Sequence, residues 1–113
     1  MGELRRLSEC EELIMSIVWT SDEAPDLSIV QKRVNEKCGK NWKPTTVSTF
    51  LTRLVRKGFL DSYRKGRYVY YVPQITLQDY RKMVVGEVIK VLYGGHSEVL
   101  ISDVKDAFSV LGL

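Results

Sequence analysis

The sequence predicts a mostly α-helical protein with one small β-hairpin. Apolar residues recur every three or four positions in several segments, which is the period of an amphipathic helix. Between residues 59 and 73 the pattern changes to tyrosines and valines interrupted by a glycine, which is typical of a hairpin. A chain of 113 residues, 44% of them hydrophobic, has the length and composition of one globular domain, or of a small domain with an appendage.

The first expected helix begins with a capping signal. Residues 8–11 match S-x-x-E, a capping box in which Ser8 and Glu11 each satisfy a free backbone amide at the helix start. The helix ends at Trp19. Its apolar face consists of Leu13, Ile14, Ile17 and Val18.

Two further helices are expected before the hairpin. Asp26 is suited to cap the second helix, and Gly39 is suited to end it. Its predicted buried face is Ile29, Val30 and Val34. Pro44 suits the first turn of a third helix over about residues 44–57. The third helix is expected to bury Val47, Phe50, Leu51, Leu54 and Val55.

The hairpin and two more helices complete the predicted order. The two strands of the hairpin meet at Lys65-Gly66, and Pro73 ends the second strand. A fourth helix is expected after Thr76, and Gly94-Gly95 breaks it. A last helix is expected within part of the segment 99–110.

Three helices followed by a hairpin form the order of a winged helix-turn-helix, in which the third helix occupies the recognition position. We therefore predict a winged-helix DNA-binding domain over residues 1–74 and a C-terminal helical region over residues 75–113. There are no repeats, low-complexity runs or flexible linkers between them.

Basic charge is concentrated in the middle of the chain. Residues 1–30 have a balance of −5, residues 31–73 a balance of +9, and residues 74–113 a balance of −1. The basic segment contains the third helix and the hairpin. This distribution favours a polyanionic partner. A run of lysines and arginines taken alone would fit a solvated surface equally well.

The polar face of the third helix is made of small hydroxyl side chains followed by arginines. On a helical wheel its apolar residues lie within about 80° of Val47, and the residues of the opposite face lie about 140–200° from Val47. That opposite face carries Thr45, Thr49, Thr52 and Arg56, flanked by Ser48 and Arg53. Short side chains let a helix approach base edges in the major groove, and a threonine methyl can contact a thymine methyl.

The hairpin tip and the ends of the third helix supply positive charge. Arg64, Lys65 and Arg67 surround Gly66, so the wing at about residues 64–67 is suited to contact DNA phosphates. We expect double-stranded DNA as the partner. The predicted phosphate-binding residues are Lys43, Arg53, Arg56, Lys57, Arg64, Lys65 and Arg67.

Other protein classes have little support in the sequence. Cys10 and Cys38 match no zinc spacing, and His96 is the only histidine, so neither a metal site nor a cofactor is expected. The chain contains no phosphate-cradling glycine loop and no nucleophile–base set, so we expect no catalytic residues and no enzyme activity. No stretch is long and apolar enough for a membrane span, and the N-terminus has no secretory pattern, so a cytoplasmic location is expected.

Four blocks of the sequence resemble the penicillinase-repressor family (the BlaI/MecI/CopY group): LSECEELIMSIVW, WKPTTVSTFLTRLVRKGFL, RKGRYVYYVP and LYGG. The resemblance covers about residues 7–104. It implies a bacterial transcriptional repressor that binds a pseudo-palindromic operator as a homodimer. By position, the implied base-reading residues are Thr45, Thr46, Ser48, Thr49 and Thr52. The implied dimer interface on the fourth helix is Tyr80, Val84, Val88, Val91, Leu92 and Tyr93.

The inducing signal does not follow from the resemblance. Members that respond to β-lactams are cut at an Asn-Phe bond, and the corresponding bond here is Ser102-Asp103, so any regulatory protease is unknown. Copper-responsive members carry a C-terminal cysteine cluster, which this sequence does not contain. An alternative function is a winged-helix protein-interaction module that uses its C-terminal helices and binds no specific DNA.

Overall fold

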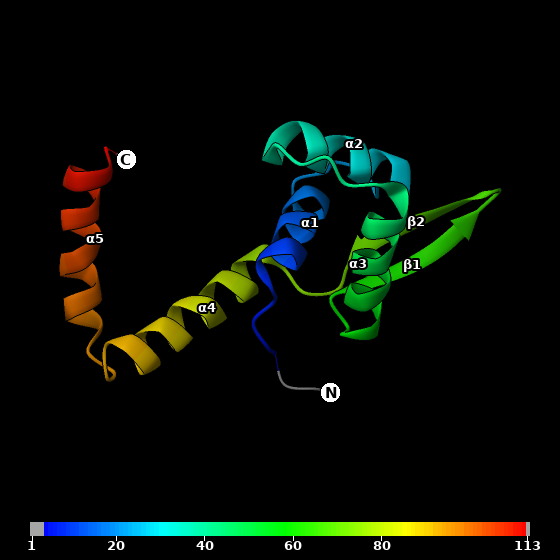
Figure 1. Cartoon of the computed structure of the whole chain (residues 1–113). Helices are drawn as coiled ribbons and strands as arrows, with labels where there is room; N and C mark the ends of the chain where they lie inside the picture. Colours follow the sequence, from blue (N-terminus) through cyan, green and yellow to red (C-terminus); the bar gives the residue numbers. More distant parts are fainter. Residues whose placement is uncertain (1–3, 113) are drawn as a thin grey trace. The chain divides into compact units, whose positions relative to one another are not determined.

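The computed structural model describes residues 4–112, which form five α-helices and one two-stranded antiparallel sheet (Figure 1). In chain order the elements are α1 (Glu9–Trp19), α2 (Leu27–Cys38), α3 (Pro44–Arg56), β1 (Leu60–Lys65), β2 (Tyr68–Pro73), α4 (Leu77–Leu92) and α5 (Ser97–Leu111). The predicted fold class, a winged helix-turn-helix followed by C-terminal helices, is confirmed. The chain divides into two compact units, one ending at Leu77 and the next beginning at Gln78.

The predicted caps form at the starts of α1 and α2. The backbone N–H of Glu11 donates to the Ser8 hydroxyl oxygen at 3.2 Å, and the Ser8 N–H donates to a Glu11 carboxylate oxygen at 2.9 Å. The Asp26 carboxylate accepts from the Ile29 N–H at 2.9 Å. These bonds satisfy amides that have no partner inside their helices, so both helices begin where local chemistry predicts.

The core of the first unit lies between α1, α2 and α3. Its fully buried side chains are Ile14 and Met15 from α1, Val30 and Val34 from α2, and Val47, Leu51 and Leu54 from α3. Burial of each such side chain contributes roughly 1.5–3 kcal/mol of transfer free energy. All three helices supply this core, so it fixes α3 against the other two helices.

One predicted core residue of α2 is outside that core. Ile29 is 37% exposed, whereas its neighbour Val30 is fully buried. Successive residues of a helix point about 100° apart, so a helix that buries Val30 and Val34 turns Ile29 away from the core. The prediction that Ile29 belongs to the buried face was wrong.

The hairpin forms with a two-residue turn and is tied back to the helices. Lys65 pairs with Tyr68, and Gly66 has a φ of 65°, which L side chains rarely adopt. The Tyr71 N–H donates to the Pro25 carbonyl at 3.0 Å, so the α1–α2 connection covers an edge of β2. The Trp19 indole N–H donates to the Ile75 carbonyl at 2.8 Å. These bonds hold the base of the wing against the helical core.

The second unit contains α5 and all of α4 after its first residue. Gly94 and Gly95, with φ values of 55° and 89°, end α4 and allow the turn into α5, as predicted. Helix α5 extends from Ser97 to Leu111, beyond the predicted 99–110. None of the α5 residues is buried. Within residues 4–112, no helix combines the length and the apolar character that a bilayer crossing requires.

Candidate nucleic-acid interface

The predicted hydroxyl face of α3 is directed toward solvent. Thr45, Thr49 and Thr52 are exposed, while Thr46 and Ser48 at the sides of that face are half-buried. The opposite side of the same helix carries Val47, Leu51 and Leu54, each fully buried. Helix α3 therefore presents its small polar side chains on the surface because its apolar side is fixed in the core.

Thr49 has a defined hydroxyl orientation. Its Oγ1–H donates to the Thr45 carbonyl, one helical turn earlier, at 2.9 Å. That bond uses the hydroxyl proton, so the oxygen lone pairs and the methyl group are what Thr49 offers to a partner. A methyl group at this position is suited to contact the methyl group of a thymine in the major groove.

The first turn of α3 is open to a negatively charged ligand. Lys43 is its N-cap residue and makes no side-chain cap hydrogen bond, and Pro44 follows at the first helical position. The backbone amides of this turn therefore lack the side-chain cap that α1 and α2 have. Lys43 itself is exposed, as its predicted contact with a phosphate requires.

The arginines at the C-terminal end of α3 are exposed and partly fixed by packing. Arg53 lies with its guanidinium carbon 5.9 Å from the centre of the Phe50 ring, within the range of a cation–π contact. Arg53 and Arg56, together with Ser8, Glu11 and Lys57, line a hollow of about 380 Å³. Both arginines are exposed, as a contact with phosphate would require, and that contact stays a prediction.

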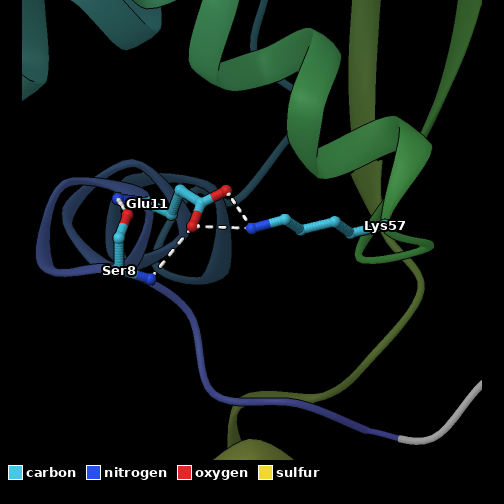
Figure 2. A network of polar contacts seen from close by, with 3 residues as sticks. All are labelled: Ser8, Glu11 and Lys57. Carbon is cyan, nitrogen blue, oxygen red and sulfur yellow. Dashed lines mark hydrogen bonds and ion pairs between the residues drawn. The ribbon is translucent and has the colours of Figure 1, made fainter.

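Lys57 has a partner inside the protein that the sequence did not suggest. Its Nζ donates to the two carboxylate oxygens of Glu11 at 2.9 and 2.7 Å, and Figure 2 shows the carboxylate between Lys57 and Ser8. The Glu11 side chain is 4% exposed, whereas the Lys57 side chain is 48% exposed. Lys57 thus joins the end of α3 to the start of α1, and we remove it from the predicted phosphate-binding set.

The environment of Glu11 favours its ionised form. Burial by itself raises the pKa of the carboxyl group, but the hydrogen bonds from Lys57 and Ser8 together bring the pKa of Glu11 below its ordinary value of 4.5. The carboxylate therefore stabilises the folded state above about pH 4.5, and this contribution is lost as the pH falls through the lowered pKa.

The turn between α2 and α3 is held by side chains of α2. Asn35 accepts from the Trp42 N–H at 2.9 Å and donates to the Trp42 carbonyl at 3.1 Å. The Gln31 amide donates to the same carbonyl at 3.1 Å. The Trp42 ring packs against Phe50 of α3, with ring centres 5.2 Å apart. These contacts fix the backbone just before α3 and so set the direction in which α3 begins.

The wing carries its charges at an exposed tip and an aromatic stripe on one face. Arg64, Lys65 and Arg67 are all exposed. Tyr63 and Tyr70 are opposite each other in the two strands, and their rings stack at 5.5 Å. Cross-strand aromatic pairs of this kind stabilise a hairpin by roughly 0.2–1 kcal/mol. The stacked tyrosines therefore stiffen the element that presents the basic tip.

The residues predicted for a dimer interface differ in exposure. Val91 and Leu92 are each 74% exposed, whereas Tyr80 is 4% exposed in the isolated chain. The remaining three, Val84, Val88 and Tyr93, are half-buried. The Tyr93 hydroxyl donates to the Asp103 carboxylate of α5 at 2.8 Å, and this bond raises the pKa of Tyr93 above its ordinary value.

Neither cysteine is part of a disulfide, and both Cys10 and Cys38 are half-buried. Among residues 4–112 no group of three or more histidine, cysteine, aspartate or glutamate side chains is arranged to hold a metal ion.

Comparisons with known proteins identify the family. Residues 7–109 match the family model described as "Penicillinase repressor". This chain belongs to the penicillinase repressor family. Family members are transcriptional repressors rather than enzymes. This confirms the predicted family and the prediction that the protein is not an enzyme.

A curated relative and two solved structures show the extent of the similarity. The penicillinase repressor of Bacillus licheniformis is 29% identical over 97 residues, which is 84% of this chain and 72% of that protein. The solution structure of the DNA-binding domain of the repressor BlaI is 30% identical, with a TM-score of 0.59. The monomeric form of B. licheniformis BlaI in complex with the blaP half-operator is also 30% identical, with a TM-score of 0.57. Each structural match covers 71% of this chain and 94% of the BlaI chain.

Three structural roles in this penicillinase repressor homologue were missed by sequence reasoning. The capping box signalled the local role of Glu11, but nothing near Glu11 signalled its bond to Lys57, 46 residues away. Asn35 and Gln31 lie on the polar face of α2, where the sequence pattern predicts side chains that contact only solvent. Their hydrogen bonds to Trp42 depend on the path of the backbone after Gly39, which periodicity does not predict.

Proposed function

We propose that this chain represses transcription by binding a pseudo-palindromic operator as a homodimer. In each protomer α3 enters the major groove, and the wing contacts the adjacent phosphate backbone. The two copies of α3 lie about one duplex turn apart, near 34 Å, and the bound dimer blocks access of polymerase to the promoter. The observation that carries this proposal is the exposed threonine face of α3 beside a basic wing on a rigid core.

The proposed DNA-binding residues form two groups, one that reads bases and one that binds phosphates. Thr45, Thr46, Ser48, Thr49 and Thr52 supply discrimination between base sequences, because their short side chains allow close approach to base edges. Lys43, Arg53, Arg56, Arg64, Lys65 and Arg67 supply affinity for phosphates that depends on salt and not on sequence. The BlaI half-operator complex supports this proposal through a protein of similar sequence and fold.

The dimer is proposed to form through the second unit. Its exposed apolar residues are Val85, Val91, Leu92, Val99, Ile101, Val104, Phe108, Val110 and Leu111. A soluble monomer rarely leaves so many large apolar side chains open to water. A second copy of α4 and α5 would cover them, so we extend the proposed interface from the six residues predicted on the fourth helix to α5. Tyr80, which is already buried, would contribute to the interface only indirectly.

Binding to an operator implies that the protein acts in the bacterial cytoplasm. The same apolar surface would also suit the alternative function, a protein-interaction module without specific DNA binding. The two functions differ in their DNA binding. A repressor retards the promoter fragment upstream of its own gene more strongly than a random fragment, and higher salt weakens both complexes. An interaction module shows no salt-sensitive retardation of either fragment.

Oligomeric state is tested separately, by size-exclusion chromatography with light scattering. We expect the mass of two chains at micromolar concentration. A strict monomer under these conditions would contradict the proposed dimer. It would leave the binding of one protomer to a half-operator to be decided by the retardation experiment.

A further inference from the structure

The N-terminal segment before α1 carries two arginines that no part of the proposed DNA interface includes. Arg5 and Arg6 are both exposed and immediately precede Leu7, which is 6% exposed and therefore fixed in the core. We call residues 4–7 the arm. Among residues 1–30, which have a balance of −5, Arg5 and Arg6 are the only basic residues.

The structure places the arm beside the basic end of α3. Arg5, Arg6 and Lys57 line a hollow of about 340 Å³, with Leu7 and Phe59 as its apolar wall. A second hollow, lined by Arg53 and Arg56, also includes Lys57. The two hollows share Lys57, whose charge is balanced by Glu11, and the remaining cations Arg5, Arg6, Arg53 and Arg56 form one basic band around them.

The band has more positive charge than its acidic neighbours balance. Among the described residues, the Glu11 carboxylate is already engaged by Lys57, and the other ion pair of the band joins Glu12 to the Arg6 side chain at 4.0 Å. In the described part of the chain, no ion pair is found for Arg5, Arg53 or Arg56. The Arg6 side chain remains 51% exposed despite its contact with Glu12.

Like charges gathered around a hollow repel one another and focus a positive potential into it, which favours an anion at that place. Arg56 belongs to the exposed face of α3 that we assign to the major groove. A band that continues from Arg56 to the arm is therefore continuous with the proposed DNA surface. The anion best placed to contact both Arg56 and the arm is a phosphate of the same duplex, beside the groove that α3 enters.

We propose that Arg5 and Arg6 bind the DNA backbone, extending the contact of each protomer beyond α3 and the wing. This proposal rests on the proposed DNA-binding function. Arginine is suited to this role because its guanidinium group donates two parallel hydrogen bonds to phosphate oxygens. The contact adds affinity for any duplex and carries no preference for base sequence.

The test measures how binding of the full chain to a random-sequence duplex depends on salt. Each phosphate contact contributes about 0.9 to the slope of log affinity against log salt concentration. The double variant Arg5→Gln/Arg6→Gln should lower that slope by about one to two per protomer. A matched control is Arg81→Gln/Lys82→Gln, an adjacent exposed basic pair of α4 with the same change in net charge. The control should leave the slope nearly unchanged.

Two further measurements separate the arm from indirect effects. Arg5→Lys/Arg6→Lys keeps the charge and should restore most of the slope. The urea unfolding midpoint of the glutamine double variant should match that of the wild type, because both arginine side chains are exposed. An unchanged midpoint with a lower slope supports a direct contact with DNA.

Two results would overturn the proposal. In the first, the wild type binds the duplex but the glutamine double variant keeps the full slope. In the second, the α4 control lowers the slope as much as the arm variant does, so that only net charge matters. If the first result is found and inorganic phosphate raises the melting temperature of the wild type but not of the arm variant, the hollow binds a free anion instead of DNA. A wild type that binds no duplex would instead refute the proposed function.

Discussion

Replacing Lys57 by methionine should destabilise the first unit because it leaves the buried Glu11 carboxylate without its counter-ion. The carboxylate then keeps only the hydrogen bond from the Ser8 N–H. Loss of a charged partner costs roughly 1.5–3 kcal/mol per hydrogen bond, and removing one member of a fully buried pair costs about 3–5 kcal/mol. The Lys57 side chain is 48% exposed, so water compensates in part. We therefore expect a loss of about 2 kcal/mol.

The assay is urea unfolding at pH 7, followed by the fluorescence of Trp19 and Trp42, both in the first unit. In a separate thermal unfolding experiment, a loss of 2 kcal/mol corresponds to a decrease of roughly 10 °C in Tm for a unit of this size. Glu11→Gln is the matched control. It retains an acceptor for the Ser8 N–H and leaves a lysine that water can solvate, so it should cost less, about 1 kcal/mol.

The pH dependence has a defined sign. The pKa of Glu11 is lowered in the folded state, so the wild type has the full contribution of the carboxylate above about pH 4.5 and loses it as the pH falls through the lowered pKa. The stability difference between wild type and Lys57→Met should therefore shrink in acid. At a temperature where both proteins are folded, Lys57→Met should bind DNA with an unchanged salt slope. If Lys57→Met is as stable as the wild type and its salt slope is lower by about one, the ion-pair assignment is refuted. Lys57 then returns to the phosphate-binding set.

Three further predictions concern DNA binding and the turn before α3. Thr49→Ala should reduce the binding free-energy preference for operator over random DNA by roughly 1 kcal/mol per half-site. Thr49→Val keeps the methyl group and should lose less of this preference. Equal losses of affinity for both DNAs in a binding titration would contradict base contact. Arg67→Ala should weaken binding to every duplex and lower the salt slope by about one per protomer, and a selective loss on the operator would argue against a phosphate contact. Asn35→Leu should cost about 1–3 kcal/mol in urea unfolding and reduce operator preference, because the Trp42 N–H loses its acceptor. Asn35→Asp keeps an acceptor and should retain more of both properties; the Asn35 assignment fails if the leucine variant retains wild-type stability and operator preference.

Local signals in the sequence predicted most of the fold. The capping box at Ser8, the cap at Asp26 and the glycine pair after α4 all mark element boundaries where the structure has them. These signals work because caps and turns depend on groups within about four residues of each other. Ile29 was misplaced because its position beside Val30 fits an apolar face in sequence, and only the packing of α2 decides which of the two is buried.

The candidate site was predictable on the outer face of α3 and at the wing tip. Thr45, Thr49 and Thr52 are exposed because the opposite side of their helix is apolar, and that contrast is visible in the sequence. Gly66 and the basic residues around it likewise predicted the exposed wing tip. What each of these side chains contacts on DNA remains a proposal, supported by the resemblance to BlaI and by the geometry of the face.

By itself the sequence determined the order of the helices and strands and most of their boundaries, which face of α3 is polar, and where positive charge is concentrated. Only the tertiary structure decided which distant groups meet: the Lys57 ammonium with the Glu11 carboxylate, the Asn35 amide with the Trp42 backbone, and the arm with the end of α3. The physical reason is range. Helical periodicity and capping act over one or two turns, whereas these pairings require the packed core to bring separate segments within hydrogen-bonding distance or around a common hollow.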